Sequence, residues 1–244
     1  MEPLAAAGLG MAALAASIIG GAAGIGAAIA LIPAVALTVG VREAVPVVTV
    51  AVTMHLFSRI WVNRASIDYR VAGWFALGGV PGAIAGALVF ANAPVELLGR
   101  GLGVFLLAVV VYRRLPLGQV RIGLRGFVAV GAAQGFLSAM FGGAGPFGAV
   151  FMLNYGLVRN AFVGTMAVAT LGISAAKLPV YGGYALLDRR ALVIAVILGA
   201  IMMVGALIGG AIAHRVSDRF FVVAIEVLIA FGGVVLLIQT WGAS

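Results

Sequence analysis

Residues 126–157 read GFVAVGAAQGFLSAMFGGAGPFGAVFMLNYGL and contain no charged side chain. A helix needs about 20 apolar residues to cross the hydrocarbon core of a bilayer. This stretch is therefore too long for one straight crossing and too short for two. Gly142, Gly143, Gly145 and Pro146 interrupt it near its middle, and residues of these types disfavour a continuous helix. The stretch predicts a membrane segment that is broken inside the bilayer.

The rest of the chain has the same apolar character. Hydrophobic residues make up 64% of the 244 residues and charged residues 9%. Soluble domains carry about 25% charged residues, so a soluble enzyme and a nucleic-acid-binding protein are both excluded. Lipid offers the backbone no hydrogen-bond partner, so long apolar segments must be helices, and we expect an all-α polytopic membrane protein. Charges, prolines and glycines divide it into about eight hydrophobic segments, at 4–40, 44–62, 71–91, 95–112, 126–157, 160–182, 191–213 and 219–240.

An internal repeat links the two halves of the sequence. Residues 24–26 resemble 142–146, residues 67–70 resemble 187–190, and residues 86–88 resemble 205–207, at offsets of about 116 to 120. Secondary transporters are commonly built from such duplicated halves. We predict two homologous repeats of about 120 residues, at 1–116 and 117–244, within one integral membrane domain. The first segment of each repeat is predicted to be broken at glycines near mid-membrane.

The relative direction of the two repeats stays open at this stage. The halves are parallel if segments 4–40 and 126–157 each cross once, and inverted if each dips in and returns. Both arrangements place ten Lys and Arg residues in the cytoplasm and five outside, with loops 63–70 and 113–125 inside in either case. Segment length favours the inverted arrangement.

The two predicted breaks are the first candidates for a binding site. Broken helix ends offer free N–H groups and a positive dipole end, which suit an anion. Close helix packing is the alternative role of membrane glycines, and we predict it for Gly78, Gly82, Gly86, Gly205 and Gly209. The candidate binding residues at the breaks are Gly24, Gly26, Gly142, Gly143, Gly145 and Pro146.

Polar residues on the second segment of each half are further candidates. At an offset of 118 Arg59 aligns with Lys177, so each half carries a cation late in this segment. Two cations facing one cavity would bind an oxyanion, whereas the alternative is that both side chains reach the lipid headgroups. His55 is either a proton carrier or an interhelical contact. The polar candidates on segments 44–62, 126–157 and 160–182 are Thr49, Thr53, His55, Arg59, Gln134, Ser138, Asn154, Thr165, Thr170, Ser174 and Lys177.

Acidic residues are few. Glu226 lies near the centre of segment 219–240 and is a candidate for proton coupling, with a structural pairing to an arginine as the alternative. Asp68 and Asp188 are predicted to cap helices. The chain has two histidines and no cysteine, and it lacks enzyme and ATP-binding motifs, so we expect no catalysis, no metal and no cofactor.

These features together resemble the TauE/SafE family. The resemblance lies in the glycine-broken first segment, the Gly-x-Arg-x-Ala turn at 40–44, and the Asp-Tyr-Arg loop at 68–70 that enters a glycine-rich helix. It covers residues 20–44 with 64–86 and residues 142–165 with 184–210. The family's small residue followed by Thr or Ser is present as Gly164-Thr165, but Pro46-Val47 departs from it in the first half.

The resemblance implies a multi-pass protein of the bacterial inner membrane that exports sulfite or a sulfonate. The expected mechanism is secondary transport of a small anion by alternating access, with a proton-coupled variant through Glu226 or His55. The expected partners are the anion and the lipid bilayer, without nucleic acid, and a homo-oligomer is allowed. A passive anion channel and a non-transporting accessory or scaffold subunit are the alternatives.

Overall fold

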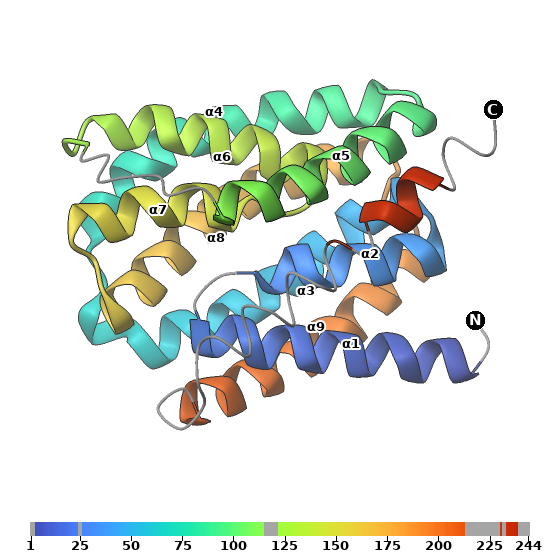
Figure 1. Cartoon of the computed structure of the whole chain (residues 1–244), viewed down its shortest axis with the longest axis horizontal. Helices are drawn as coiled ribbons and strands as arrows, with labels where there is room; N and C mark the ends of the chain where they lie inside the picture. Colours follow the sequence, from blue (N-terminus) through green and yellow to red (C-terminus); the bar gives the residue numbers. More distant parts are fainter. Residues whose placement is uncertain (1–2, 24–25, 115–121, 213–229, 231–232, 239–244) are drawn as a thin grey trace.

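The computed structural model describes residues 3–23, 26–114, 122–212, 230 and 233–238. These residues contain helices and no strand, which confirms the predicted all-α class (Figure 1). Residues 233–238 are also helical, and the rest of the predicted segment 219–240 lies almost entirely outside the described residues. The other helices are α1 Pro3–Ala23, α2 Ala27–Val39, α3 Val41–Asn63, the 3-10 turn η1 Arg64–Ser66, α4 Tyr69–Asn92, α5 Val95–Arg114, α6 Gly126–Phe141, α7 Gly145–Tyr155, α8 Arg159–Gly183 and α9 Arg189–Ile212.

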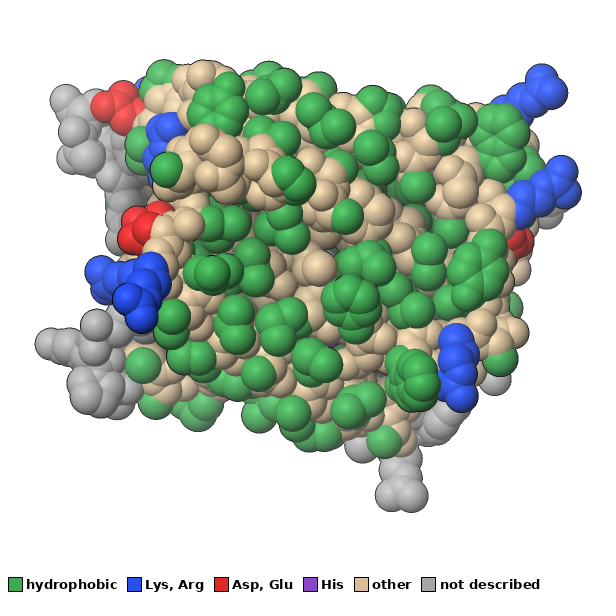
Figure 2. All heavy atoms as spheres, turned by 180° about the vertical axis from the view of Figure 1, so that it is seen from behind, with side chains coloured by type: hydrophobic (Ala, Val, Ile, Leu, Met, Phe, Trp, Pro, Cys, Tyr) green, Lys and Arg blue, Asp and Glu red, His purple; other side chains and the backbone are tan. Residues whose placement is uncertain are grey.

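Several of these helices have the length and composition of membrane spans. Five qualify within the described residues, at Val41–Ser66, Tyr69–Asn92, Val95–Tyr112, Asn160–Gly183 and Arg189–Ala211. Figure 2 shows hydrophobic side chains over the middle of one face and charged side chains gathered at its two ends. An apolar belt between two charged ends is the surface that a bilayer requires. The fold is therefore that of a polytopic membrane protein.

The first segment of each predicted repeat is two helices rather than one. Segment 4–40 consists of α1 and α2, and Gly26, directly before α2, has φ +99°. Segment 126–157 consists of α6 and α7, and Gly142, directly after α6, has φ +76°. Both glycines adopt left-handed backbone conformations that side chains with a Cβ disfavour. The Gly148 N–H of α7 donates to Gln134 Oε1 of α6 at 2.9 Å, so α7 folds back along α6.

The second helices of the two halves lie side by side and antiparallel. Arg59, near the end of α3, donates from Nη2 to the Val163 carbonyl near the start of α8 at 3.2 Å. The first helices likewise run from opposite ends of the molecule: α1 begins at the end where the N-terminus lies, and α6 begins at the other (Figure 1). Helices that the predicted repeat makes equivalent, α3 with α8 and α1 with α6, therefore point in opposite directions.

Glycines bring the first helix of one half against the third helix of the other. A Cβ on Gly78 of α4 would meet the backbone of Val128 in α6, and a Cβ on Gly209 of α9 would meet the backbone of Ile18 in α1. Gly82, Gly86 and Gly205 make similar approaches, so the predicted packing role of these five glycines is confirmed. If one predicted half is placed on the other, the pair α4–α6 corresponds to the pair α9–α1.

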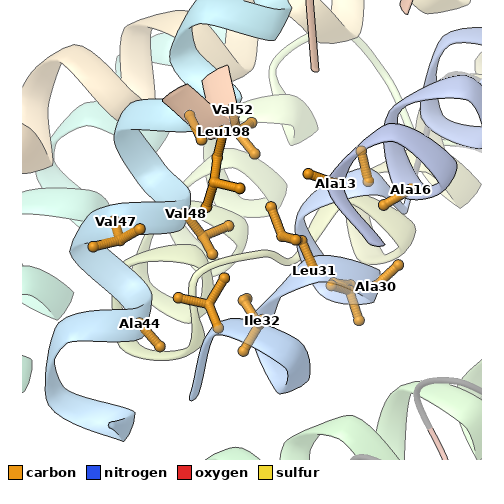
Figure 3. Packing of buried hydrophobic residues seen from close by; sticks show 14 of the residues in the cluster. Ala13, Ala16, Ala30, Leu31, Ile32, Ala44, Val47, Val48, Val52 and Leu198 are labelled. Carbon is orange, nitrogen blue, oxygen red and sulfur yellow. The ribbon is translucent and has the colours of Figure 1, made fainter. Parts of the chain in front are cut away.

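The largest apolar core packs α2, which follows the first helix break, against α1 and α3. Ala13 and Ala16 of α1 lie beside Ala30 and Leu31 of α2, and Ile32 of α2 lies farther from α1, toward Val48 of α3 (Figure 3). All six side chains are buried. The small alanines let α1 approach α2 closely, and the branched side chains of α2 fill the space toward α3. This packing places the start of α2 in the interior of the protein.

Candidate functional site

The two helix breaks meet at one cavity of about 60 Å³. Residues 26–29 and 142–145 line it, together with side chains of α3, α6 and α8. The breaks are in contact, because a Cβ on Gly143 would lie 2.9 Å from Ala28 Cβ and 3.0 Å from Ile29 Cγ1. The volume corresponds to a few water molecules, so only a small ligand fits.

The structure brings many of the predicted site residues to this cavity. Those that line it are Gly26, Thr49, His55, Arg59, Gln134, Ser138, Gly142, Gly143, Gly145, Thr170, Ser174 and Lys177. Residues 27–29, the first turn of α2, were not singled out from the sequence. Their position directly after Gly26 was the available signal, because the first turn of a helix follows its break. Gly24 and Glu226 lie outside the described residues.

Lys177 is held at the cavity by one neighbouring helix. Its side chain is 2% exposed, and Nζ donates to the carbonyl and to Oγ of Ser138, both at 3.0 Å. An ammonium group has three N–H donors, so these two bonds leave one for a ligand.

Arg59 connects α3 to α8. Its side chain is 8% exposed, it donates to the Val163 carbonyl, and its own carbonyl accepts from Asn63 Nδ2 at 2.8 Å. Both cations are thus buried, which argues against the alternative that they reach lipid headgroups. Among the described residues that line the cavity, Arg59 and Lys177 are the charged side chains, and both are basic.

His55 is held in one tautomer. It is 1% exposed, and Nδ1 lies 3.2 Å from the Met202 carbonyl oxygen of α9. A carbonyl oxygen only accepts, so Nδ1 carries the hydrogen and Nε2 of the neutral ring is an acceptor. Nε2 is buried and has no hydrogen-bond partner in the described part of the chain.

Two helix N-termini converge on the same space. The cavity is lined by the first turn of α2, from Gly26 to Ile29, and by Ala144 and Gly145 at the start of α7. First-turn N–H groups have no acceptor within their helix and carry the positive end of its dipole. The arrangement therefore adds backbone donors to the two cations.

Four predicted site residues do not line the cavity. Thr165 Oγ1 accepts from the Asp68 N–H at 2.9 Å and so holds the α3–α4 loop against α8. Thr53 Oγ1 donates to the Thr49 carbonyl at 2.7 Å within α3. Pro146 is buried in the first turn of α7, where its missing N–H is not needed, and Asn154 lies near the end of that helix. Whether each of these side chains reaches the cavity depends on the rotation of its helix about the helix axis. The type of residue does not indicate that rotation.

The predicted caps are present. Asp68 Oδ1 accepts from the N–H groups of Arg70 and Val71, each at 3.0 Å, at the start of α4. Asp188 Oδ1 accepts from the Ala191 N–H at 2.6 Å at the start of α9. Both predictions of helix capping are confirmed.

Comparison with known proteins identifies a family. A family model described as sulfite exporter TauE/SafE matches residues 9–236. No curated protein and no solved structure matches the chain. The family match spans both helix breaks, both buried cations and His55. The chain therefore belongs to the sulfite exporter TauE/SafE family, a family of membrane transporters, and is a multi-pass membrane protein.

Proposed function

We propose that this protein is a secondary transporter that exports a small anion, sulfite or a sulfonate, across the bacterial inner membrane. The observation that carries the proposal is the cavity between the two helix breaks, where Arg59 and Lys177 are buried beside two helix N-termini. The buried ammonium group of Lys177 hydrogen-bonds to Ser138, and a partner of opposite charge would further offset the cost of its burial. A bound anion is such a partner, and the family description names sulfite.

The groups that line the cavity would each bind a different part of the anion. Arg59 offers a planar fork that suits two oxygens of an oxyanion, and Lys177 offers a point charge. The first turns of α2 and α7 add N–H donors, and the hydroxyls of Thr170 and Ser174 adjust to the remaining oxygen atoms. This donor set recognises the oxyanion group rather than the rest of the ligand, which fits sulfite and small sulfonates alike.

Alternating access follows from the arrangement of the halves. We take residues 1–116 and 117–244 to be inverted repeats, since α3 and α8 are antiparallel and each contributes one cation to the cavity. A site between two inverted halves opens to one side or the other when the halves rock. Coupling to protons through His55 or Glu226 is the variant of this mechanism that the chain allows.

The test replaces both cations with uncharged residues. We expect Arg59→Gln with Lys177→Met to abolish sulfite binding and uptake in proteoliposomes. Arg64→Gln is the matched control, because Arg64 is exposed and its guanidinium lies 4.6 Å over the Trp61 ring, outside the cavity. Unchanged uptake by the folded double variant would remove both residues from the site.

The same liposomes separate a carrier from the alternatives. A carrier saturates with sulfite and exchanges internal for external anion. Conductance without saturation or exchange would indicate a passive channel. A folded protein that neither binds nor moves any small anion would indicate an accessory or scaffold subunit.

A further inference from the structure

We propose that Gln134 binds the transported anion through its amide N–H groups, while its amide oxygen holds α7 against α6. The inference rests on the proposed function, since it places an anion in the cavity between the helix breaks. It adds an uncharged binding residue to the two cations, the helix N-termini and the hydroxyls of Thr170 and Ser174. The alternative is that Gln134 only fastens α7 to α6 and does not touch the ligand.

The hydrogen bond to α7 fixes the direction of the Gln134 amide. Oε1 accepts from the Gly148 N–H at 2.9 Å, and a backbone N–H can only donate. The oxygen end of the amide is therefore at α7, and the nitrogen end, with its two N–H groups, is turned away from that contact. A Cβ on Gly148 would meet Oε1, so the glycine makes room for this approach.

The amide nitrogen is open to the cavity. The Gln134 side chain is 1% exposed and lines the cavity. Nε2 makes no hydrogen bond to the described residues, yet it is not sealed among protein atoms, as Nε2 of His55 and Nδ2 of Asn154 are. Two N–H donors therefore face an internal space without an acceptor from the described residues. An oxyanion there would accept charge-assisted hydrogen bonds from them.

Lys177 brings a positive charge close to this amide. Ser138 follows Gln134 by four residues, so the two lie on the same face of α6, one helical turn apart. The carbonyl and Oγ of Ser138 each accept from Lys177 Nζ at 3.0 Å. The ammonium group is thereby held about one turn, roughly 5.4 Å, along α6 from the position of Gln134. One oxyanion bridges such a distance with a hydrogen bond of about 3 Å on each side.

The side of the amide that the ligand meets has only donors. A free amide group could bind a cation through its oxygen or an anion through its nitrogen. The Gly148 N–H occupies Oε1 outside the cavity lining, so the nitrogen is the end that a ligand reaches. Gln134 therefore favours an anion without adding a second buried charge to α6.

Gln134→Glu separates binding from the alternative structural role. The glutamate keeps an oxygen that accepts from the Gly148 N–H and replaces the N–H donors with a second carboxylate oxygen. We expect its affinity for sulfite, measured by titration calorimetry, to fall about 10-fold to 100-fold. Asn154→Leu is the control, because it removes a buried amide that does not line the cavity, and its affinity should be unchanged. Unchanged affinity in folded Gln134→Glu would leave Gln134 with the structural role alone.

Amide signals in the unmodified protein test the contact directly. The chain has three glutamines, Gln119, Gln134 and Gln239, so labelling with nitrogen-15 glutamine gives three pairs of side-chain N–H signals. We expect sulfite to move one pair to lower field, with the same concentration dependence as the calorimetric titration, because a hydrogen bond to an anion deshields the proton. No movement in any pair at saturating sulfite would overturn the inference and leave the proposed function standing. Absence of sulfite binding in the calorimeter would overturn the proposed function itself.

Two further variants assign the moving pair without changing the site. Gln119→Met and Gln239→Met each remove one of the other glutamines. We expect both variants to keep the pair that moves with sulfite. Its loss in either variant would place the contact at another glutamine and overturn the assignment to Gln134. This result does not depend on whether Gln134→Glu folds.

Discussion

Lys177 shows at the scale of one residue how burial and binding oppose each other. Its ammonium group is inside the protein with Ser138 as its hydrogen-bonding residue. We predict that Lys177→Met leaves the melting temperature unchanged or raises it, because a buried charge is exchanged for an apolar stem of similar length. The same change should weaken sulfite binding about 10-fold to 100-fold, because it removes a charge-assisted hydrogen bond. Thermal unfolding and titration calorimetry on the same preparation check both outcomes.

We expect Thr165 to stabilise the folded protein rather than to bind the anion. Its hydroxyl oxygen accepts from the Asp68 N–H. Thr165→Val leaves that N–H without its acceptor, and we predict a loss of about 1–3 kcal/mol in the free energy of unfolding. Thr38→Val is the control, because Thr38 is exposed and donates only within its own helix, to Ala34 and Val35. A loss of the same size in both variants would show that the α3–α4 loop does not depend on Thr165.

The sequence identifies the polar residues of the membrane segments but does not determine which of their side chains face the cavity. The predicted repeat aligns Arg59 with Lys177, and both residues line the same cavity. Thr165 and Asn154 were placed with the binding residues because of their type. Their side chains face elsewhere, because the direction of a side chain depends on the rotation of its helix against its neighbours. Hydrophobic periodicity is weak evidence for that rotation when lipid and protein interior are equally apolar.

The two helix breaks are the elements whose geometry is least determined by the sequence pattern. The glycines predicted that segments 4–40 and 126–157 are interrupted, and α1–α2 and α6–α7 confirm it. Segment length favours the arrangement in which each segment dips in and returns, and α7 does fold back along α6. That return depends on the bond from Gly148 to Gln134, which joins residues 14 positions apart. Composition alone does not distinguish a kinked helix from a helical hairpin.

The crossing of α4 and α6 depends on the absence of side chains. A Cβ on Gly78 would meet the Val128 carbonyl, which cannot move without shifting α6. We predict that Gly78→Ala destabilises the protein by about 1–3 kcal/mol. Gly73→Ala in the same helix is the control, because a Cβ there has nothing within 4 Å and should stabilise α4 by up to about 1 kcal/mol. Denaturant unfolding in detergent measures both, and equal effects would mean that α4 and α6 are not in close contact.

The proposed mechanism depends on the relative direction of the two halves. The number of Lys and Arg residues on each side does not distinguish parallel from inverted halves, because both arrangements place ten inside and five outside. The contacts between helices favour the inverted arrangement. The end of α3 contacts the start of α8, α1 packs on α9, and α4 packs on α6. One cation from each half reaches the shared cavity, so in the proposed mechanism a rocking motion of either half would change access to it.

An inverted arrangement places the two loops between second and third helices on opposite faces of the membrane. The chain has no cysteine, so single cysteines can be introduced without other changes. Ser66 and Gly183 are exposed, one after α3 and one at the end of α8. We predict that Ser66→Cys reacts with a membrane-impermeant maleimide only from the cytoplasmic side, because the surrounding loop is rich in arginine. Gly183→Cys should react only from the outside. Labelling of both from one side would make the halves parallel, and a carrier that rocks about inverted repeats would then lose its structural basis.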